Sequence, residues 1–179
     1  LIHDDLPSMD NDVERRGKPS VWAKYGEATA ILAADAMQAL AFRVAAKSPR
    51  NPVAVVDALA AAGVGVVKGQ VEDVAKSDGL EFIYLHKTSD LFVAAAVMGG
   101  LAAGGTDAEI AALRVFARNL GMAFQFEDDL LDGDSPFTKT EIESRVRETT
   151  NAAIAALSAL SGNTDFLTQL AASLVGRDK

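Results

Sequence analysis

The sequence predicts an all-α protein, and three observations support that prediction. Apolar residues recur at helical spacing along most of the chain, and no stretch alternates apolar and polar residues as a half-buried strand does. Alanine accounts for 33 of the 179 residues and aromatic residues are scarce, which favours closely packed helices. Capping signals mark the starts of several helices. The length is typical of one domain, so we expect a single domain over residues 1–179.

The first two long helices are expected on either side of a proline-containing break. Alanine and leucine fill residues 26–47 at helical spacing. Asn51 is placed to cap the second helix, which begins with proline and covers residues 52–76. Gly63 and Gly65 lower the stability of a helix, so we expect them to allow close packing or a bend.

Capping signals also predict the later helices. A helix is expected over residues 80–103, after a turn. Thr106 and Glu109 have the spacing of a capping box, and so do Thr138 and Glu141. The helices that follow these signals are expected over residues 106–132, over residues 138–160, and from residue 164 onward.

Composition excludes several classes of function. The formal net charge of −8 argues against binding nucleic acid through phosphate neutralisation. The absence of cysteine excludes disulfides, thiolate catalysis and cysteine-based zinc sites, and two histidines are too few for a histidine-rich metal site. An apolar content of 49% argues against a disordered chain.

Hydropathy and the first residue bear on location. The most apolar windows, residues 58–67 and 91–103, are shorter than the roughly 20 residues of a membrane span, so we expect no span. No leader sequence is recognisable, which makes the cytoplasm the default expectation. The chain begins at Leu1 rather than methionine, so we expect the natural N-terminus to lie further upstream.

Two acidic clusters lie directly beside apolar helices, at residues 4–12 and 128–132. Asp128 and Asp132 are four residues apart and share a helical face, where like charges repel unless a cation binds them. Carboxylate oxygens suit Mg²⁺, which completes its shell with phosphate oxygens. Either cluster alone is consistent with a solvated acidic helix end, but two clusters together favour a metal site.

Polar and cationic residues occur between the two clusters. Arg15 and Arg16 follow the first cluster, and Lys87 lies on a largely apolar helix. Such residues bind phosphate groups. The ordinary alternatives are a basic loop that balances nearby aspartates, and a lysine whose ammonium group reaches solvent. Gln70 and Asp73 share a helical face, which is also consistent with an exposed helix surface.

These motifs resemble, in order and spacing, those of trans-isoprenyl diphosphate synthases of the short-chain farnesyl or geranylgeranyl type. The first acidic cluster with the basic residues after it is similar to the motif DDxxxxD, and residues 121–132 are similar to the motif DDxxD. The intervening motifs of the family match Gly69-Gln70 with Asp73, and His86-Lys87-Thr88. The resemblance covers residues 1–134. The family's N-terminal third and its later Gly-Lys and Asp-Lys motifs have no counterpart here.

The resemblance implies an isoprenoid synthase fold, in which helices surround a deep central cavity, and a prenyltransferase reaction. Isopentenyl diphosphate would condense head to tail with dimethylallyl, geranyl or farnesyl diphosphate, by ionisation, condensation and proton loss. Diphosphate would be released, and the product would have fifteen to twenty carbons. About three Mg²⁺ ions per active site would assist the ionisation.

The same resemblance implies roles for individual residues. The residues that would bind the metal ions, directly or through a hydrogen bond to a ligand, are Asp4, Asp5, Asp10, Asp128, Asp129 and Asp132. Gln70 and Asp73 would hydrogen-bond the groups that bind the metal. The residues that would bind the substrate diphosphates are Arg15, Arg16, Lys87 and Gln125, with Arg15 and Lys87 on the allylic diphosphate and Arg16 on that of isopentenyl diphosphate. Thr88 and Gln125 would turn oxygens toward the developing allylic cation.

Two other functions fit the same motifs. A terpene cyclase uses the same metal chemistry, but it has no need of a second diphosphate site such as Arg16 would supply. A non-catalytic regulatory subunit typically loses aspartates from one motif, whereas both motifs are intact here. The family is usually homodimeric, so we expect a homodimer, with the apolar faces of helices 26–47 and 52–76 as candidate interfaces.

Overall fold

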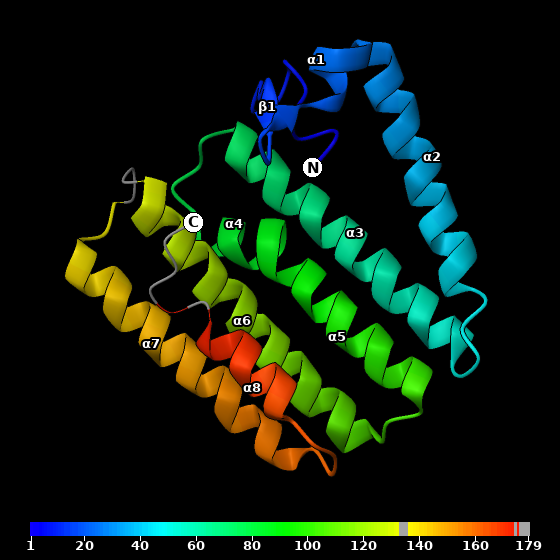
Figure 1. Cartoon of the computed structure of the whole chain (residues 1–179), viewed down its shortest axis with the longest axis vertical. Helices are drawn as coiled ribbons and strands as arrows, with labels where there is room; N and C mark the ends of the chain where they lie inside the picture. Colours follow the sequence, from blue (N-terminus) through cyan, green and yellow to red (C-terminus); the bar gives the residue numbers. More distant parts are fainter. Residues whose placement is uncertain (133–135, 174, 176–179) are drawn as a thin grey trace. The chain divides into compact units, whose positions relative to one another are not determined.

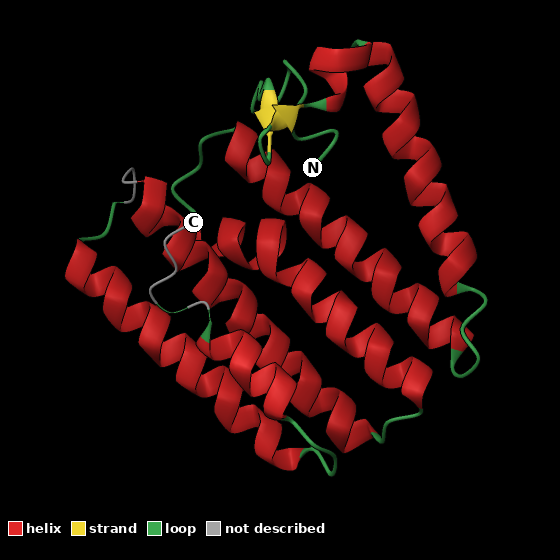
Figure 2. Cartoon of the chain, in the orientation of Figure 1, coloured by secondary structure: helices red, strands yellow, loops and turns green. Residues whose placement is uncertain are grey.

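The structure is a computed structural model that describes residues 1–132, 136–173 and 175, and it is predominantly helical (Figure 2). The chain divides into two compact units, residues 1–47 and residues 48–179, and each is described by itself. The expected all-α class is confirmed. The expectation of a single domain stays a prediction.

The first unit consists of a turn-rich segment, a small hairpin and two helices. The strands β1 (Glu14–Arg15) and β2 (Lys18–Pro19) pair antiparallel, and the helices are α1 (Val21–Tyr25) and α2 (Glu27–Ala45). The sequence reading missed the hairpin and α1, because strands of two residues are too short to show alternation. Arg16 and Gly17, at φ 55° and 73°, make the two-residue turn with both φ angles positive that suits a hairpin.

The second unit is a layer of long helices joined by short connections. In Figure 1, α3, α5, α6 and α7 lie side by side in that order, and each contacts the next. The elements are α3 (Pro52–Val74), α4 (Leu80–Ile83), the π-helix η1 (Tyr84–Ser89), α5 (Asp90–Ala103), α6 (Asp107–Asp132), α7 (Lys139–Ala156), the 3₁₀ turn η2 (Leu157–Ala159) and α8 (Asp165–Ala172). Two buried apolar clusters hold α6 and α7 together, around Phe116 and Leu120 and around Phe126 and Val146.

The helix starts confirm most of the capping predictions. The Thr106 backbone N–H donates to Glu109, whose own N–H donates to the Thr106 hydroxyl, and the Thr138–Glu141 pair repeats this capping box. Asn51 is the N-cap residue of α3 and Pro52 is its first residue, as predicted, but the side chain of Asn51 does not cap the helix. Asn51 has left-handed backbone angles, and its Nδ2 donates instead to the carbonyl of Leu101 at 3.0 Å.

The helix predicted over residues 80–103 is interrupted by the π-helix η1. Glycines of neighbouring helices approach η1 closely on two sides. A Cβ at Gly69 of α3 would overlap the backbone of Lys87, and a Cβ at Gly121 of α6 would lie 2.7 Å from Ser89 Cα. These two glycines therefore let α3 and α6 contact the backbone of η1. Gly63, by contrast, faces open space.

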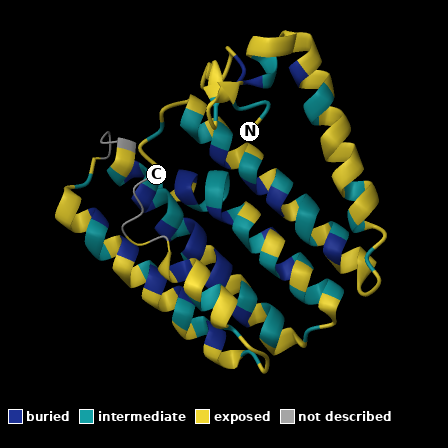
Figure 3. Cartoon of the chain, in the orientation of Figure 1, coloured by how far each residue is buried: buried dark blue, intermediate teal, exposed yellow. Residues whose placement is uncertain are grey.

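Two helices leave long apolar faces exposed (Figure 3). Along α2 only Ala30 is buried, although the helix carries five exposed large apolar residues: Ile31, Leu32, Met37, Leu40 and Val44. The exposed apolar residues of α3 are Val53, Val64, Val67, Val71 and Val74. Both helices have the length and apolar content of a membrane span, against the sequence expectation, but core helices and signal sequences pass that test too.

Candidate functional site

In the first unit, the predicted metal ligand Asp5 and the predicted phosphate ligand Arg15 bind each other. Arg15 Nε donates to Asp5 Oδ1 at 2.6 Å, and Nη2 lies 2.5 Å from the same oxygen. The Asp5 side chain is only 3% exposed, whereas that of Arg15 is 31% exposed. The hydrogen bond to Asp5 raises the pKa of Arg15, which stays charged at any pH of interest. A buried carboxylate therefore fixes a guanidinium that still reaches solvent.

The other predicted residues of this unit lie around that ion pair. The backbone N–H of Asp10 donates to the carbonyl of Asp4 at 3.0 Å, which brings the first and third aspartates of the motif together. Asp10 is exposed and Asp4 is partly exposed. Arg16 lies at the exposed tip of the hairpin. The turn geometry thus places one arginine against the aspartates and presents the next to solvent.

In the second unit, Lys87 of η1 and Asp73 of α3 form a close ion pair. Lys87 Nζ lies 2.6 Å from Asp73 Oδ2, and both side chains are partly exposed. Gln70 lies one helical turn before Asp73 on α3, and the helix then ends at Val74. Because Gly69 allows the backbone of Lys87 to approach α3, the lysine is held beside the polar end of that helix.

A chain of hydrogen bonds joins η1 to the acidic end of α6. Thr88 Oγ1 donates to Gln125 Oε1 at 2.8 Å, and Gln125 Nε2 donates to Asp129 Oδ1 at 3.2 Å. The second oxygen of Asp129 accepts a hydrogen bond from the hydroxyl of Tyr84. Asp129 is 9% exposed and Tyr84 is 4% exposed. The predicted pair Thr88 and Gln125 is therefore part of a four-residue chain, and Asp129 is buried within it.

The remaining aspartates of the second cluster complete the acidic end of α6. Asp128 is partly exposed, and the side chain of Asp132 lies outside the described residues. Among the described side chains, no three carboxylates or histidines come together as a complete metal site. The roles predicted for these residues stay predictions.

Comparison with known proteins identifies the family. A sequence model described as polyprenyl synthetase matches residues 1–143. The chain belongs to this family. It is 45% identical over 150 residues to the heterodimeric geranylgeranyl pyrophosphate synthase large subunit 1 of Arabidopsis thaliana, and 44% identical over 146 residues to a geranylgeranyl pyrophosphate synthase of Capsicum annuum. Each match covers 74% of this chain but only 40% of the relative, so the chain spans less than half the length of these synthases.

Solved structures give the same family fold. The FPP/GFPP synthase of Zymomonas mobilis matches with a TM-score of 0.89 at 32% identity, over 98% of this chain and 70% of that one. The geranyltransferase of Legionella pneumophila matches with a TM-score of 0.85 at 32% identity, over 99% of this chain and 69% of that one. The isoprenoid synthase fold expected from the motifs is confirmed.

The polar clusters include two residues, Tyr84 and Asp12, to which the sequence analysis assigned no role. Tyr84 hydrogen-bonds the carboxylate of Asp129, 45 positions later in the chain. Asp12 adds a second, longer contact to Arg15 at 3.4 Å. The signal for Asp12 was present, since it lies three residues before Arg15. No sequence spacing indicates that Tyr84 and Asp129 meet, because that contact depends on how η1 packs against α6.

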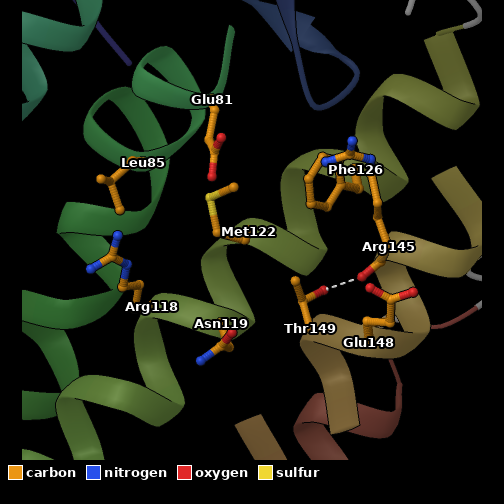
Figure 4. Close-up of a pocket in the computed structure, with 9 residues that line it drawn as sticks. All are labelled: Glu81, Leu85, Arg118, Asn119, Met122, Phe126, Arg145, Glu148 and Thr149. Carbon is orange, nitrogen blue, oxygen red and sulfur yellow. Dashed lines mark hydrogen bonds between the residues drawn. The ribbon is translucent and has the colours of Figure 1, made fainter. Parts of the chain in front are cut away.

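An open pocket of about 230 Å³ lies on the second unit of this chain, between η1, α6 and α7 (Figure 4). Arg118 and Asn119 line it from α6 and Glu148 lines it from α7, and the hydroxyl of Thr149 donates to the carbonyl of Arg145 there. Its lining includes none of the residues to which the sequence analysis assigned a role. The pocket is therefore separate from the polar chain described above.

Proposed function

We propose that this chain condenses isopentenyl diphosphate with an allylic diphosphate and releases diphosphate. The observation that carries the proposal is the placement, within one unit, of Lys87 and Thr88 on η1 beside Asp73 and Gln125. A fixed cation and oriented hydroxyl and amide groups suit a reaction in which a diphosphate leaves and a carbocation forms. The names of the relatives, geranylgeranyl pyrophosphate synthases, favour a twenty-carbon product.

The carboxylates fit Mg²⁺ bound together with substrate. Asp4 and Asp10 form a neighbouring pair in the first unit, and Asp128 lies on α6 in the second. Mg²⁺ usually takes one or two carboxylates and completes its shell with water and substrate phosphates, so small groups of aspartates suit it better than a complete protein cage. Bound Mg²⁺ would neutralise the charge that develops on the leaving diphosphate. We propose Asp4, Asp10 and Asp128 as its holders, in about three ions per site.

The cationic side chains would bind the two diphosphates. Arg15 bonds Asp5 and Asp12 through Nε and Nη2. Its Nη1 takes no part in these bonds, so it can donate to the allylic diphosphate. Lys87 would act as a point charge on the same group, and Arg16 would bind isopentenyl diphosphate. Arg15 and Lys87 each face an aspartate, which orients them before substrate arrives.

Thr88 and Gln125 would stabilise the allylic cation with oriented dipoles. Their hydrogen bond fixes both side chains without placing a full negative charge at their oxygens. A carbocation needs an environment that excludes water and offers mild dipoles, because water would capture it. No histidine is part of this polar chain, and the proton lost after condensation would pass to the released diphosphate.

We further propose a homodimer formed through apolar helix faces. α2 is an apolar helix with one buried residue, and α3 exposes five valines. Contiguous exposed apolar faces are typical of interaction surfaces. Light scattering after size exclusion would give twice the chain mass of 18.7 kDa. A monomer would contradict this part of the proposal.

The experiment that tests the activity supplies labelled isopentenyl diphosphate, Mg²⁺, and dimethylallyl, geranyl or farnesyl diphosphate in turn. Products are dephosphorylated and sized by chromatography. Linear prenyl alcohols with fifteen or twenty carbons are expected. Cyclic hydrocarbons formed from an allylic diphosphate alone would indicate a terpene cyclase. A folded protein that binds Mg²⁺ but incorporates no label with any primer would indicate a non-catalytic subunit.

A further inference from the structure

The hydrogen-bond chain between η1 and α6 has a fixed direction, because some of its groups can only accept hydrogen bonds. A carboxylate accepts hydrogen bonds, so the side of Gln125 that faces Asp129 must be its NH₂ group. The carbonyl of the Gln125 amide then faces Thr88, at 2.8 Å. Asp129 therefore determines which way round the Gln125 amide sits.

The orientation of Gln125 in turn determines where the Thr88 hydroxyl points its proton. A threonine hydroxyl has one proton and two lone pairs. Because Gln125 presents a carbonyl oxygen, the proton of Thr88 is directed at it, and the lone pairs of Thr88 are left for other partners. If the amide were reversed, its NH₂ group would donate to Thr88 and occupy one of those lone pairs. A flip of Gln125 would thus change the dipole that Thr88 offers to a cation.

Tyr84 holds Asp129 in the position from which Asp129 orients the Gln125 amide. Its hydroxyl donates to Asp129 Oδ2, which leaves Oδ1 facing Gln125. The Tyr84 ring is buried and packs edge-on against Phe126, with centroids 5.6 Å apart and planes at 86°. Such packing fixes the ring and therefore the hydroxyl. Tyr84 and Thr88 lie on η1, and Asp129 and Gln125 lie on α6. The chain of hydrogen bonds therefore links the two elements at two points.

We propose that Tyr84 and Asp129 are positioning residues that hold the amide of Gln125 and the hydroxyl of Thr88 in the orientation that stabilises an allylic cation. This inference rests on the proposed prenyltransferase function. It assigns Asp129 a positioning role beyond the metal ligation that the motif resemblance implies, since both of its oxygens accept hydrogen bonds from protein groups. It also assigns a role to Tyr84, which lies outside the aspartate motifs.

The first test measures the amide of Gln125 directly and needs no turnover. The chain has four glutamines, at positions 38, 70, 125 and 169, so selective ¹⁵N-glutamine labelling gives four side-chain amide pairs in an NMR spectrum. The Gln125→Glu variant identifies the signal of Gln125 by its loss. Tyr84→Phe and Asp129→Asn should shift this signal and speed its hydrogen exchange by about tenfold or more.

Tyr25→Phe is the matched control, because the chain has two tyrosines and Tyr25 is exposed. It should leave the Gln125 signal unchanged. A Gln125 amide whose shift and exchange are the same in wild type, Tyr84→Phe and Asp129→Asn would overturn the inference.

The second test separates positioning from simple stability. Tyr84→Phe should lower kcat about tenfold, and Asp129→Asn about a hundredfold, because the oriented dipole acts on the transition state. The KM values of both substrates should stay within about twofold. A purely structural role would instead lower the melting temperature and leave kcat of the folded enzyme intact, which would contradict the inference. Absence of turnover in wild type would refute the proposed function, while the NMR result would still decide whether the hydrogen-bond chain exists.

Discussion

The two units build their polar clusters in different ways. In the first unit, Asp5 and Arg15 are ten residues apart and meet through a turn-rich segment and a two-residue hairpin. In the second unit, the polar pairs join different helices, as Tyr84 does with Asp129 across 45 residues. The first cluster is thus held by local chain geometry, and the second depends on how closely helices pack.

This difference indicates where each cluster is vulnerable. The second cluster needs α3 and α6 to approach the backbone of η1, which Gly69 and Gly121 permit. The first cluster needs one buried carboxylate, Asp5, to hold Arg15. Packing changes should therefore disrupt the second unit, and charge changes should disrupt the first.

Gly69→Ala is expected to give the largest effect. The new methyl group would overlap the backbone of Lys87, which cannot move without separating η1 from α3. We expect a loss of about 2 kcal/mol in the free energy of unfolding, measured by urea denaturation. Gly63→Ala is the matched control in the same helix, because a Cβ at Gly63 would have no atom of another element within 4 Å. It should stabilise the protein by about 0.5 kcal/mol, and equal losses in both variants would contradict this account of the packing.

Asp5→Asn should give the next largest effect, confined to the first unit. The change removes the charge that Arg15 binds most closely and leaves its partly buried guanidinium with only the longer, exposed contact to Asp12. We expect a loss of about 2 kcal/mol in urea denaturation. Asp12→Asn removes the longer and more exposed contact at 3.4 Å and should cost less than about 0.5 kcal/mol. Equal costs for the two variants would show that the Asp5–Arg15 pair is not what holds this segment.

Glu109 should make the second unit sensitive to acid. Hydrogen bonds from Ser161 and from Thr106 lower the pKa of Glu109 from 4.5 to about 2. A carboxylate with a lowered pKa contributes stability that is complete above pH 4.5 and is lost as the pH falls through about 2. Melting temperatures measured from pH 6 downward should therefore fall less steeply for Glu109→Gln than for wild type in this window. Parallel curves would refute the assignment.

Arg16→Gly should have the smallest effect on the fold. Glycine suits the positive φ of 55° at this position, so the side chain is removed without strain in the hairpin. We expect an unchanged melting temperature and a KM for isopentenyl diphosphate raised about tenfold. A KM equal to that of wild type would remove Arg16 from the proposed substrate site.

Most of the fold could be predicted from the sequence, because helical periodicity and capping boxes are local signals. The boundaries of α2, α6 and α7 agree with their predictions within a few residues. The hairpin and the π-helix could not be predicted, since the first is too short for a pattern and the second has the residue content of an ordinary helix. Gly65 does permit close packing, as expected, because its missing Cβ leaves room for the carboxylate of Asp90.

For the candidate site, the sequence indicated which residues matter but not which residues they contact. Lys87 and Thr88 were singled out, but their bonds to Asp73 and Gln125 depend on the packing of η1 against α3 and α6. Tyr84 was missed for the same reason. Asp5 and Arg15 were assigned to metal and phosphate separately, although their proximity in sequence allowed the ion pair that the structure shows.

The most direct test of the central claim, that both aspartate clusters serve one reaction, measures turnover and melting temperature together for Asp4→Ala and Asp128→Ala. Each change removes a charge proposed to hold Mg²⁺, so each should abolish prenyl transfer. The melting temperature should stay near that of wild type, because neither residue belongs to the buried core. Turnover that survives the loss of either aspartate would contradict the claim. A collapse of the melting temperature would instead assign that aspartate a structural role.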